Sequence, residues 1–322
     1  MHIPDNYLSP STCAVLGAAM VPIWVVVFRK VKKEITLQKL PVLGIFSAFS
    51  FLIMMFNIPL PGGTTGHAIG ATLIAVLMGP FVACITVTVA LLIQALFFGD
   101  GGILAFSVNC FNMAFLMPFA GYYIYRLIKN VAGNNKAGNL VALFLASYVS
   151  LNIAAFAAAI QFGIQPILFR SQSGLPLYAP YPIGISIPAM MIPHLLVVGL
   201  VEALVSVGIY SYVSRINPEM IHGDKPSRLK PAYAMIVFMV ILSPLGLLAS
   251  GTAWGEWGNE ELRKMLGYIP IGMGKGFSFG SLIPGYAIPS INNEVMAYAI
   301  SAMLGVAIIF ISFKAIALYI KK

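Results

Sequence analysis

The first two residues of the sequence, Met1 and His2, carry the donor atoms of a metal chelator. With Met1 as the first residue of the mature chain, its α-amine, the His2 amide nitrogen and the His2 Nδ1 can bind one ion through fused chelate rings. The amide nitrogen must lose its proton, which Ni(II), Cu(II) and sometimes Co enforce. Three nitrogens in one plane leave one corner of a square vacant, and Ni(II) and Cu(II) prefer this geometry. We expect Met1 to be retained, because a bulky second residue disfavours its removal.

Another neutral imidazole can fill the vacant corner. Besides His2, the sequence has His67, His194 and His222. His222 lies in a basic segment on the inner side, out of reach of the tail. His194 is a possible ligand but lies deep in a predicted span. His67 follows PGGTTG on the outer side, and these glycines let a backbone segment approach closely. We therefore predict that Met1, His2 and His67 are the metal ligands. The alternative readings are a tail residue without a role for His2 and a capping or surface residue for His67.

Several other polar residues can support such a site. Asp100, Asn109 and Asn112 lie near the GDGG segment, and their side chains can orient His67 or the tail. Turning of the loop and ordinary amide bonding between helices are the alternatives for these three residues. Asp5 can hold the tail by a hydrogen bond.

The roles of several acidic residues are left open. Glu202 is the one acid deep in a predicted span, and it can act in coupling or form a polar network with His194. The outer loop of the second unit has Glu256, Glu260 and Glu261 with Trp254 and Trp257, and these acids can attract cations or form a solvated rim. That loop has no histidine or cysteine, so we expect no direct metal ligand from it.

Composition places these residues in a helical membrane protein. The 322 residues are 59% hydrophobic and 9% charged, with a mean hydropathy of +0.91. Most of the 19 Lys and Arg residues fall in segments 29–39, 126–136, 215–230 and 321–322, which flank apolar runs. This pattern indicates topology by the positive-inside rule and not nucleic-acid binding. Because the first basic segment follows the first span, we expect the N-terminus outside, with no cleaved signal peptide, and the C-terminus in the cytoplasm.

Apolar runs of about 20 residues predict the order of the spans. The core has seven, the third of which is short and can instead be re-entrant, and a two-helix hairpin follows. This topology puts Met1 and His67 on the same outer face. We expect a core at 1–213, a cytoplasmic linker at 214–231 and a second unit at 232–322. The predicted spans are 12–28, 40–58, 67–78, 81–98, 103–125, 140–162, 189–213, 232–249 and 295–319.

Two smaller features complete the sequence pattern. Cys13, Cys84 and Cys110 lie in apolar stretches without a CxxC pair, so we expect buried thiols and no disulfide. Two pairs of small residues, Ala14 with Ala18 and Gly44 with Ala48, have a spacing that permits close helix contact, and they can face a partner in the membrane.

Three motifs together resemble one family. MHIPDNYLSP at the start, GGTTGHAIGA at 62–71 and GDGGILAFSVNCFNMAF at 99–115 resemble the cobalt/nickel substrate-capture (S) components of energy-coupling factor (ECF) transporters, the CbiM/NikM family. The stretch SPLGLLASGTAWGEWGNEEL at 243–262 resembles the small N component fused in NikMN-type proteins. Together these resemblances cover nearly the whole chain.

The resemblance implies a fold, ligands and partners. The fold is all-α: a six-helix S-component core with an extra N-terminal helix, followed by the hairpin. The implied ligands are the amine of Met1, the amide and imidazole of His2 and the imidazole of His67. The implied partners are a transmembrane coupling subunit and two cytoplasmic ATPases in a prokaryotic cell membrane. The sequence has no GxxxxGK[ST] phosphate loop, so we expect a transport subunit and not an enzyme.

Two functions remain in competition at this stage. The first is capture of extracellular Ni2+, with Co2+ as the alternative ion, for ATP-driven uptake. The second is an autonomous secondary transporter or channel for divalent transition metals. The scarcity of charges within the spans and the lack of inverted-repeat symmetry argue against the second. The sequence has no HExxH motif, which argues against a metalloprotease.

Overall fold

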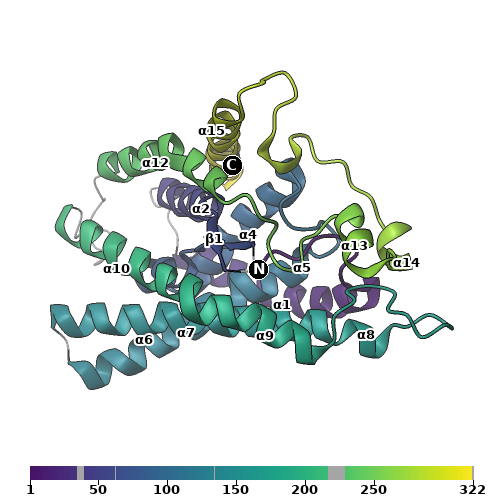
Figure 1. Ribbon diagram of the computed structural model, residues 1–322. Helices are drawn as coiled ribbons and strands as arrows, with labels where there is room; N and C mark the ends of the chain where they lie inside the picture. The colour runs from purple at the N-terminus through teal and green to yellow at the C-terminus, as the bar shows by residue number, and fades with distance from the viewer. Residues whose placement is uncertain (35–39, 62, 134, 217–228, 321–322) are drawn as a thin grey trace.

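The protein is mostly helical (Figure 1). A computed structural model describes residues 1–34, 40–61, 63–133, 135–216 and 229–320. Local sequence explains several helix boundaries. Pro80 takes the first position of its helix directly after Gly79, whose φ of 89° suits glycine. The Asn135 side chain caps the next long helix by accepting a hydrogen bond from the Gly138 N–H at 2.7 Å.

The first part of the chain forms a bundle around α4 and α7, and several of its helices contain short π-helical turns. Figure 1 shows α6, α7, α9 and α10 side by side along one edge of the molecule. In chain order the helical elements are α1 (Pro10–Glu34), α2 (Leu40–Met55), α3 (Ala71–Met78), α4 (Pro80–Ile93), η2 (Gln94–Phe98), α5 (Phe106–Asn109), η3 (Cys110–Leu116), α6 (Met117–Ala132), α7 (Lys136–Gly163), α8 (Gln165–Leu168), α9 (Ile183–Pro193), η4 (His194–Val198) and α10 (Gly199–Ile216).

The second part of the chain packs on α2. Figure 1 shows α12 and α15 next to α2, with the segment between them extending over the end of the bundle. A Cβ added to Gly44 would lie 3.0 Å from the Phe310 ring, so this small residue faces α15 of the same chain and not a partner. The elements are α12 (Lys230–Leu242), η5 (Ser243–Leu248), α13 (Asn259–Leu266), α14 (Ile271–Gly274), η6 (Pro284–Tyr286) and α15 (Glu294–Ile320).

Six helical segments of the described residues are long and apolar enough to cross a membrane. The helix α2 is apolar but shorter, and α3 has only 8 residues. At a rise of about 1.5 Å per residue, α3 reaches roughly 12 Å, less than half of a hydrocarbon core of about 30 Å. The six segments are Pro10–Lys33, Pro80–Phe98, Lys136–Leu168, Ile183–Ile216, Lys230–Leu248 and Glu294–Ile316.

The residues before α3 differ from the sequence expectation. We expected a helix from His67, but α3 begins at Ala71. The preceding residues form an antiparallel hairpin of β1 (Ile58–Leu60) and β2 (Thr64–Gly66). Gly70 has a left-handed φ of 73°, which interrupts helical geometry directly before Ala71. His67 therefore lies in a loop between the hairpin and α3.

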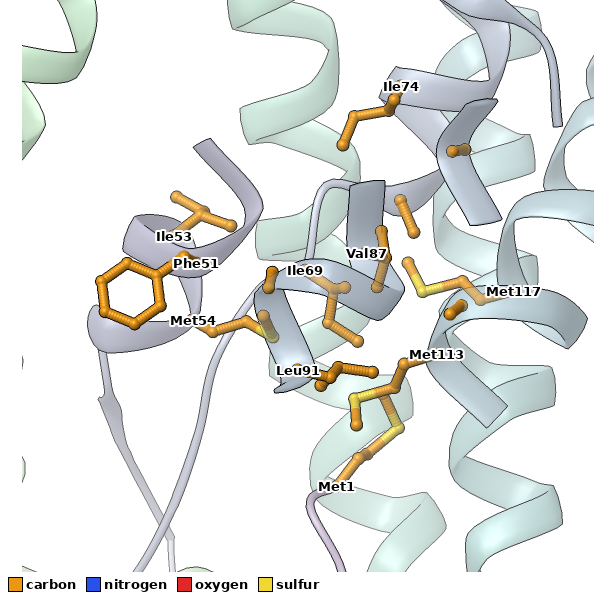
Figure 2. Packing of buried hydrophobic residues seen from close by; sticks show 14 of the residues in the cluster. Met1, Phe51, Ile53, Met54, Ile69, Ile74, Val87, Leu91, Met113 and Met117 are labelled. Carbon is orange, nitrogen blue, oxygen red and sulfur yellow. The ribbon is translucent and has the colours of Figure 1, made fainter. Parts of the chain in front are cut away.

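Apolar side chains of the central helices form one buried cluster that includes the chain start. Figure 2 shows Met1 close to Met113, with Leu91 and Ile69 nearby. The Met1 side chain is only 5% exposed, so the start of the chain is part of the core. The three cysteines are free and buried, as expected.

Candidate metal centre

The N-terminal tail, residues 1–9, runs into the interior and does not project into solvent. His2 is 2% exposed, and Ile3 and Leu8 are fully buried as well. Burying a free tail costs conformational entropy and leaves backbone groups without water, so the tail needs partners along its length. The loop 99–104 and the segment 253–279 supply most of them.

Ile3 is held on both of its backbone polar groups. Its N–H donates to Asn109 Oδ1 at 2.9 Å, and its carbonyl accepts from Asn109 Nδ2 at 3.1 Å and from the Gly102 N–H at 2.9 Å. Asn109 thereby binds the backbone of the tail at the residue directly after His2. The expectation that Asn109 can orient the tail agrees with this geometry.

Asp5 fixes the next stretch of the tail. Its carboxylate accepts from the N–H groups of Leu104 at 2.7 Å and Ile103 at 3.2 Å, as its predicted role requires. A Cβ at Gly102 would lie 2.4 Å from the Asp5 nitrogen, so only glycine permits this approach. The GDGG segment is thus needed for contact with the tail as well as for turning.

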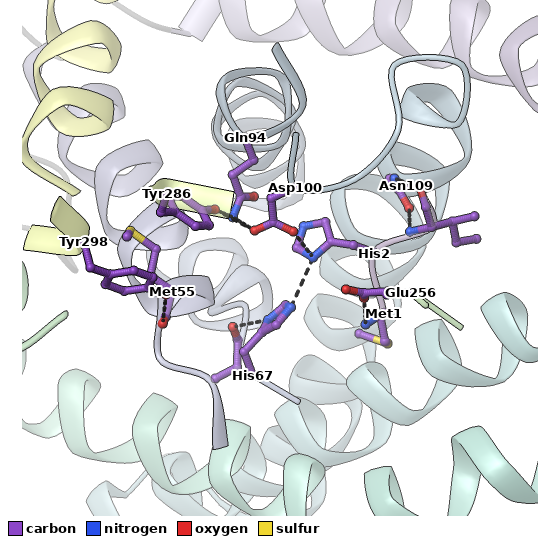
Figure 3. Close-up of polar contacts among 12 residues, drawn as sticks. Met1, His2, Met55, His67, Gln94, Asp100, Asn109, Glu256, Tyr286 and Tyr298 are labelled. Atoms are coloured by element: carbon purple, nitrogen blue, oxygen red, sulfur yellow. Dashed lines mark hydrogen bonds and ion pairs between the residues drawn. The ribbon is translucent and has the colours of Figure 1, made fainter. Parts of the chain in front are cut away.

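The two predicted histidine ligands meet (Figure 3). His2 Nδ1 lies 3.2 Å from His67 Nε2, although 65 positions separate the residues in sequence. The other nitrogen of His67, Nδ1, lies 3.1 Å from the Ala68 carbonyl oxygen, which can only accept a hydrogen bond. The hydrogen of a neutral His67 ring therefore sits on Nδ1, and Nε2 presents a lone pair toward His2.

Burial keeps both rings in the form that binds metals. Desolvation lowers the pKa of His2, and it lowers the pKa of His67 well below the ordinary value of 6.5. Asp100 raises the pKa of His2 against the larger effect of burial, and the positive chain terminus lowers both pKa values. Both imidazoles are consequently neutral at pH 7, so neither ring has to release a proton to the solvent when a metal ion binds.

Asp100 approaches the same nitrogen of His2 that faces His67. Its Oδ1 lies 3.4 Å from His2 Nδ1. Its Oδ2 accepts hydrogen bonds from the Tyr286 hydroxyl at 2.6 Å and from Gln94 Nε2 at 3.2 Å. The sequence analysis named Asp100 as a possible supporting residue. It did not identify Gln94 or Tyr286, because neither lies in a recognisable motif.

The amine of Met1 has an acidic neighbour from the second part of the chain. Glu256 Oε1 lies 3.8 Å from the Met1 nitrogen (Figure 3). Desolvation raises the pKa of Glu256 to about 7, and the nearby positive amine opposes that rise. The sequence placed Glu256 in an outer loop but gave no signal that links it to Met1.

Glu202 holds the loop that carries His67. Its carboxylate accepts from the Ile69 N–H at 2.7 Å and from the Gly70 N–H at 3.0 Å, and the side chain is fully buried. No hydrogen bond joins it to His194 within the described ranges. His194 Nδ1 lies 2.7 Å from the Met190 carbonyl oxygen, within its own helix.

Asn112 does not take part in the site. Its side-chain amide pairs reciprocally with Gln161, at 2.7 and 2.9 Å. This contact joins η3 to α7 and fits the alternative reading of amide bonding between helices. His222 lies outside the described residues.

A cavity of about 520 Å3 adjoins the two histidines. Acidic groups from three segments line it: Asp100, Glu256 and Glu294. No cluster of three or more His, Cys, Asp or Glu side chains with metal-binding geometry occurs among residues 1–34, 40–61, 63–133, 135–216 and 229–320.

Comparisons with known proteins agree on both parts of the chain. The family described as cobalt uptake substrate-specific transmembrane region, CbiM, matches residues 2–220, and the PDGLE domain matches residues 230–322. The chain is 48% identical to the probable fused nickel transport protein LarMN of Lactiplantibacillus plantarum, over 96% of this chain and 95% of that protein. It is 44% identical to the fused nickel transport protein NikMN of Rhodobacter capsulatus, with the same coverage.

A structural comparison extends this agreement to three dimensions. The crystal structure of a transition metal transporter superimposes with a TM-score of 0.64 and 52% sequence identity. The match covers 67% of this chain and 93% of that one. The fold of a large part of the chain is therefore that of this transporter.

Proposed function

Because the chain belongs to the CbiM family of cobalt uptake substrate-specific transmembrane regions, with a PDGLE domain after it, we propose that it captures Ni2+ for uptake into the cell. Co2+ is the alternative ion, since relatives include a cobalt transport protein CbiM from Geobacter sulfurreducens as well as the nickel transport proteins. The observation that carries this proposal is the 3.2 Å approach of His2 Nδ1 to His67 Nε2 beside the buried chain start.

The proposed ligands are the Met1 amine, the His2 amide nitrogen, His2 Nδ1 and His67 Nε2. Adjacent corners of a square around a metal with bonds of roughly 2 Å are about 2.8 Å apart, close to the spacing of the two imidazole nitrogens. Binding releases a proton from the amine and one from the amide. A planar four-nitrogen site favours Ni(II) over Co(II), and Cu(II) would bind more tightly still, so exclusion of copper depends on supply.

We propose further that the chain works as a substrate-capture subunit. A transmembrane coupling subunit and two cytoplasmic ATPases would supply the energy for uptake. In this arrangement the metal site faces outward in a prokaryotic cell membrane and the C-terminus faces the cytoplasm. The chain reconstituted alone should bind Ni2+ without transporting it. Steady metal flux in vesicles that contain this chain alone would instead favour an autonomous transporter.

An insertion tests the chelate directly. One glutamine between Met1 and His2 is bulky enough to disfavour removal of Met1. It lengthens the chelate and displaces the imidazole, so high-affinity Ni2+ binding should be lost. The control is one glutamine between Gly174 and Leu175, in an exposed loop. Isothermal titration with Ni2+ measures both variants, and mass spectrometry checks that Met1 is the free first residue. A yellow, diamagnetic complex is expected for the unmodified chain. Unchanged affinity in the first variant would exclude the terminal chelate.

A further inference from the structure

The side chain of Gln94 is buried, and its carbonyl oxygen lacks a hydrogen-bond partner in the part of the chain that the structure describes. Gln94 begins the π-helical turn η2, a type of turn that often occurs at functional sites. Gln94 Nε2 donates to Asp100 Oδ2 at 3.2 Å and to the Tyr286 hydroxyl at 3.3 Å. The carboxylate only accepts, so it fixes which end of the amide faces it. Gln94 Oε1 then has no hydrogen-bond partner among the described residues, although the atom is buried.

His2 has a matching unpartnered atom. Its Nδ1 faces two acceptors, the lone pair of His67 Nε2 at 3.2 Å and Asp100 Oδ1 at 3.4 Å. The hydrogen of a neutral His2 ring therefore sits on Nδ1 in this structure. His2 Nε2 is buried and has no hydrogen-bond partner in the part of the chain that the structure describes.

Metal binding reverses this arrangement. An ion at Nδ1 needs the lone pair of that nitrogen, so the neutral ring must carry its hydrogen on Nε2. Imidazole ligands generally donate this second N–H to a carbonyl or carboxylate oxygen, which fixes the ring orientation. Gln94 lies beside the His2 ring, since both side chains contact the Asp100 carboxylate, at 3.2 Å and 3.4 Å (Figure 3).

We propose that Gln94 is a positioning residue for the metal-loaded state, in which its Oε1 accepts the hydrogen that His2 carries on Nε2. This inference rests on the proposed function. The His2 ring stays neutral in both states. Without metal its hydrogen is on Nδ1, and with metal bound at Nδ1 its hydrogen is on Nε2. The contact would satisfy both buried orphan atoms at once, and Asp100 and Tyr286 would hold the amide in the required orientation (Figure 3).

Nitrogen NMR of the unmodified chain tests the tautomer. With 15N-labelled histidine and one equivalent of Ni2+, a square-planar complex is diamagnetic and its ring signals are observable. We expect the His2 ring to show a protonated Nε2 with slow solvent exchange, and a protonated Nδ1 before Ni2+ is added. Rapid solvent exchange of the His2 Nε2 hydrogen in the Ni2+-bound chain would overturn the proposal, because it would show that this hydrogen is not bonded to a buried acceptor.

A pair of variants tests the role of the side chain. Gln94→Met keeps the length of the side chain and removes the acceptor, so the slow Nε2 signal should disappear. Ni2+ affinity should fall about 10- to 100-fold, as is typical when the partner of a metal-bound histidine is lost. Gln161→Met is the matched control, since it removes a buried amide that contacts Asn112 and not His2. Its affinity and its His2 signals should not change.

The outcomes separate this inference from the proposed function. If Gln94→Met binds Ni2+ as the unmodified chain does, Gln94 has no positioning role. If His2→Ala also leaves binding unchanged, the terminal chelate itself is wrong. Loss of binding in Gln161→Met to the same extent would assign the effect to general packing and overturn the inference. Should Gln94→Met fail to fold, the exchange measurement on the unmodified chain still decides.

Discussion

His67 can act as a ligand through Nε2 because its ring hydrogen is on Nδ1, next to the Ala68 carbonyl oxygen. The Ala68 carbonyl takes the Nδ1 hydrogen, so the lone pair of Nε2 points at His2. Removing the ring should therefore remove the fourth nitrogen of the proposed site, together with the contact between His67 and His2. We expect His67→Ala to lower Ni2+ affinity more than about 100-fold, beyond the loss typical of a supporting residue. Isothermal titration measures this loss, with His222→Ala as the control, and equal affinities would contradict the ligand assignment.

The lowered pKa of His2 predicts how docking of the tail depends on pH. When the tail is undocked, the His2 ring is in water and its pKa returns toward 6.5, whereas burial in the docked tail lowers this pKa. The undocked state therefore binds more protons between pH 6.5 and the lower pKa of the docked His2 ring. Docking should weaken as pH falls through this window. Protease cleavage or hydrogen exchange of residues 1–9 without metal measures it, and equal protection at pH 5 and pH 7.5 would contradict the prediction.

The α3 helix and the loop before it depend on a single buried acid. Glu202 binds two successive backbone N–H groups, of Ile69 and Gly70, directly after His67. Glu202→Gln turns one acceptor oxygen into a donor that faces an N–H group. We expect Ni2+ affinity to fall roughly 10-fold or more as His67 shifts, and the cost of an unpaired buried group to be about 1–3 kcal/mol.

The control for Glu202 is an acid of the same type in water. Glu260→Gln changes a 74% exposed residue that pairs with Arg263 on α13, so metal affinity should not change. Thermal unfolding in detergent, read together with Ni2+ titration, separates loss of fold from loss of the site. A destabilised Glu202→Gln chain that binds Ni2+ normally would remove Glu202 from the positioning of His67.

Sequence patterns predicted the long helices better than the short hairpin before α3 and the residue at which α3 begins. Apolar runs indicated the long helices, and the Gly79–Pro80 break between α3 and α4 is where it was expected. The hairpin at 58–66 was missed because its strands have only three residues each. The start of α3 was misplaced because Gly70 takes a left-handed φ of 73°, which a helix from His67 cannot include. Glu202, more than 130 positions away, binds the backbone of this loop at Ile69 and Gly70.

The same distinction holds for the site. Met1, His2 and His67 could be named from connectivity and neighbouring glycines, and the structure brings the two rings together. Their assignment as metal ligands stays a prediction. Gln94, Tyr286 and Glu256 could not be named, since their relation to the tail exists only after the chain has folded. A sequence motif records donor atoms near each other along the chain, whereas these contacts join distant segments.

At the scale of the whole molecule, the second part of the chain covers the tail. The segment 253–279 binds Asn6 and Tyr7 directly. Asn6 Nδ2 donates to the Phe277 carbonyl at 2.7 Å and Asn6 Oδ1 accepts from the Phe277 N–H at 2.9 Å. The Tyr7 hydroxyl donates to the Trp257 carbonyl at 2.6 Å. Because the tail supplies most of the proposed ligands, these contacts should control how fast a bound ion leaves.

Release kinetics test this control of the tail. The double variant Asn6→Ala and Tyr7→Phe removes three hydrogen bonds, each worth about 0.5–1.5 kcal/mol net. We expect release of Ni2+ to a strong chelator, followed by stopped-flow absorbance, to become at least about 10-fold faster, since undocking of the tail exposes the ion. Tyr178→Phe is the control. It removes a hydroxyl group from a residue that packs next to Gly272 of α14 and that makes none of the three hydrogen bonds lost in the double variant. Equal release rates in all three proteins would mean that the second part of the chain does not hold the tail over the metal.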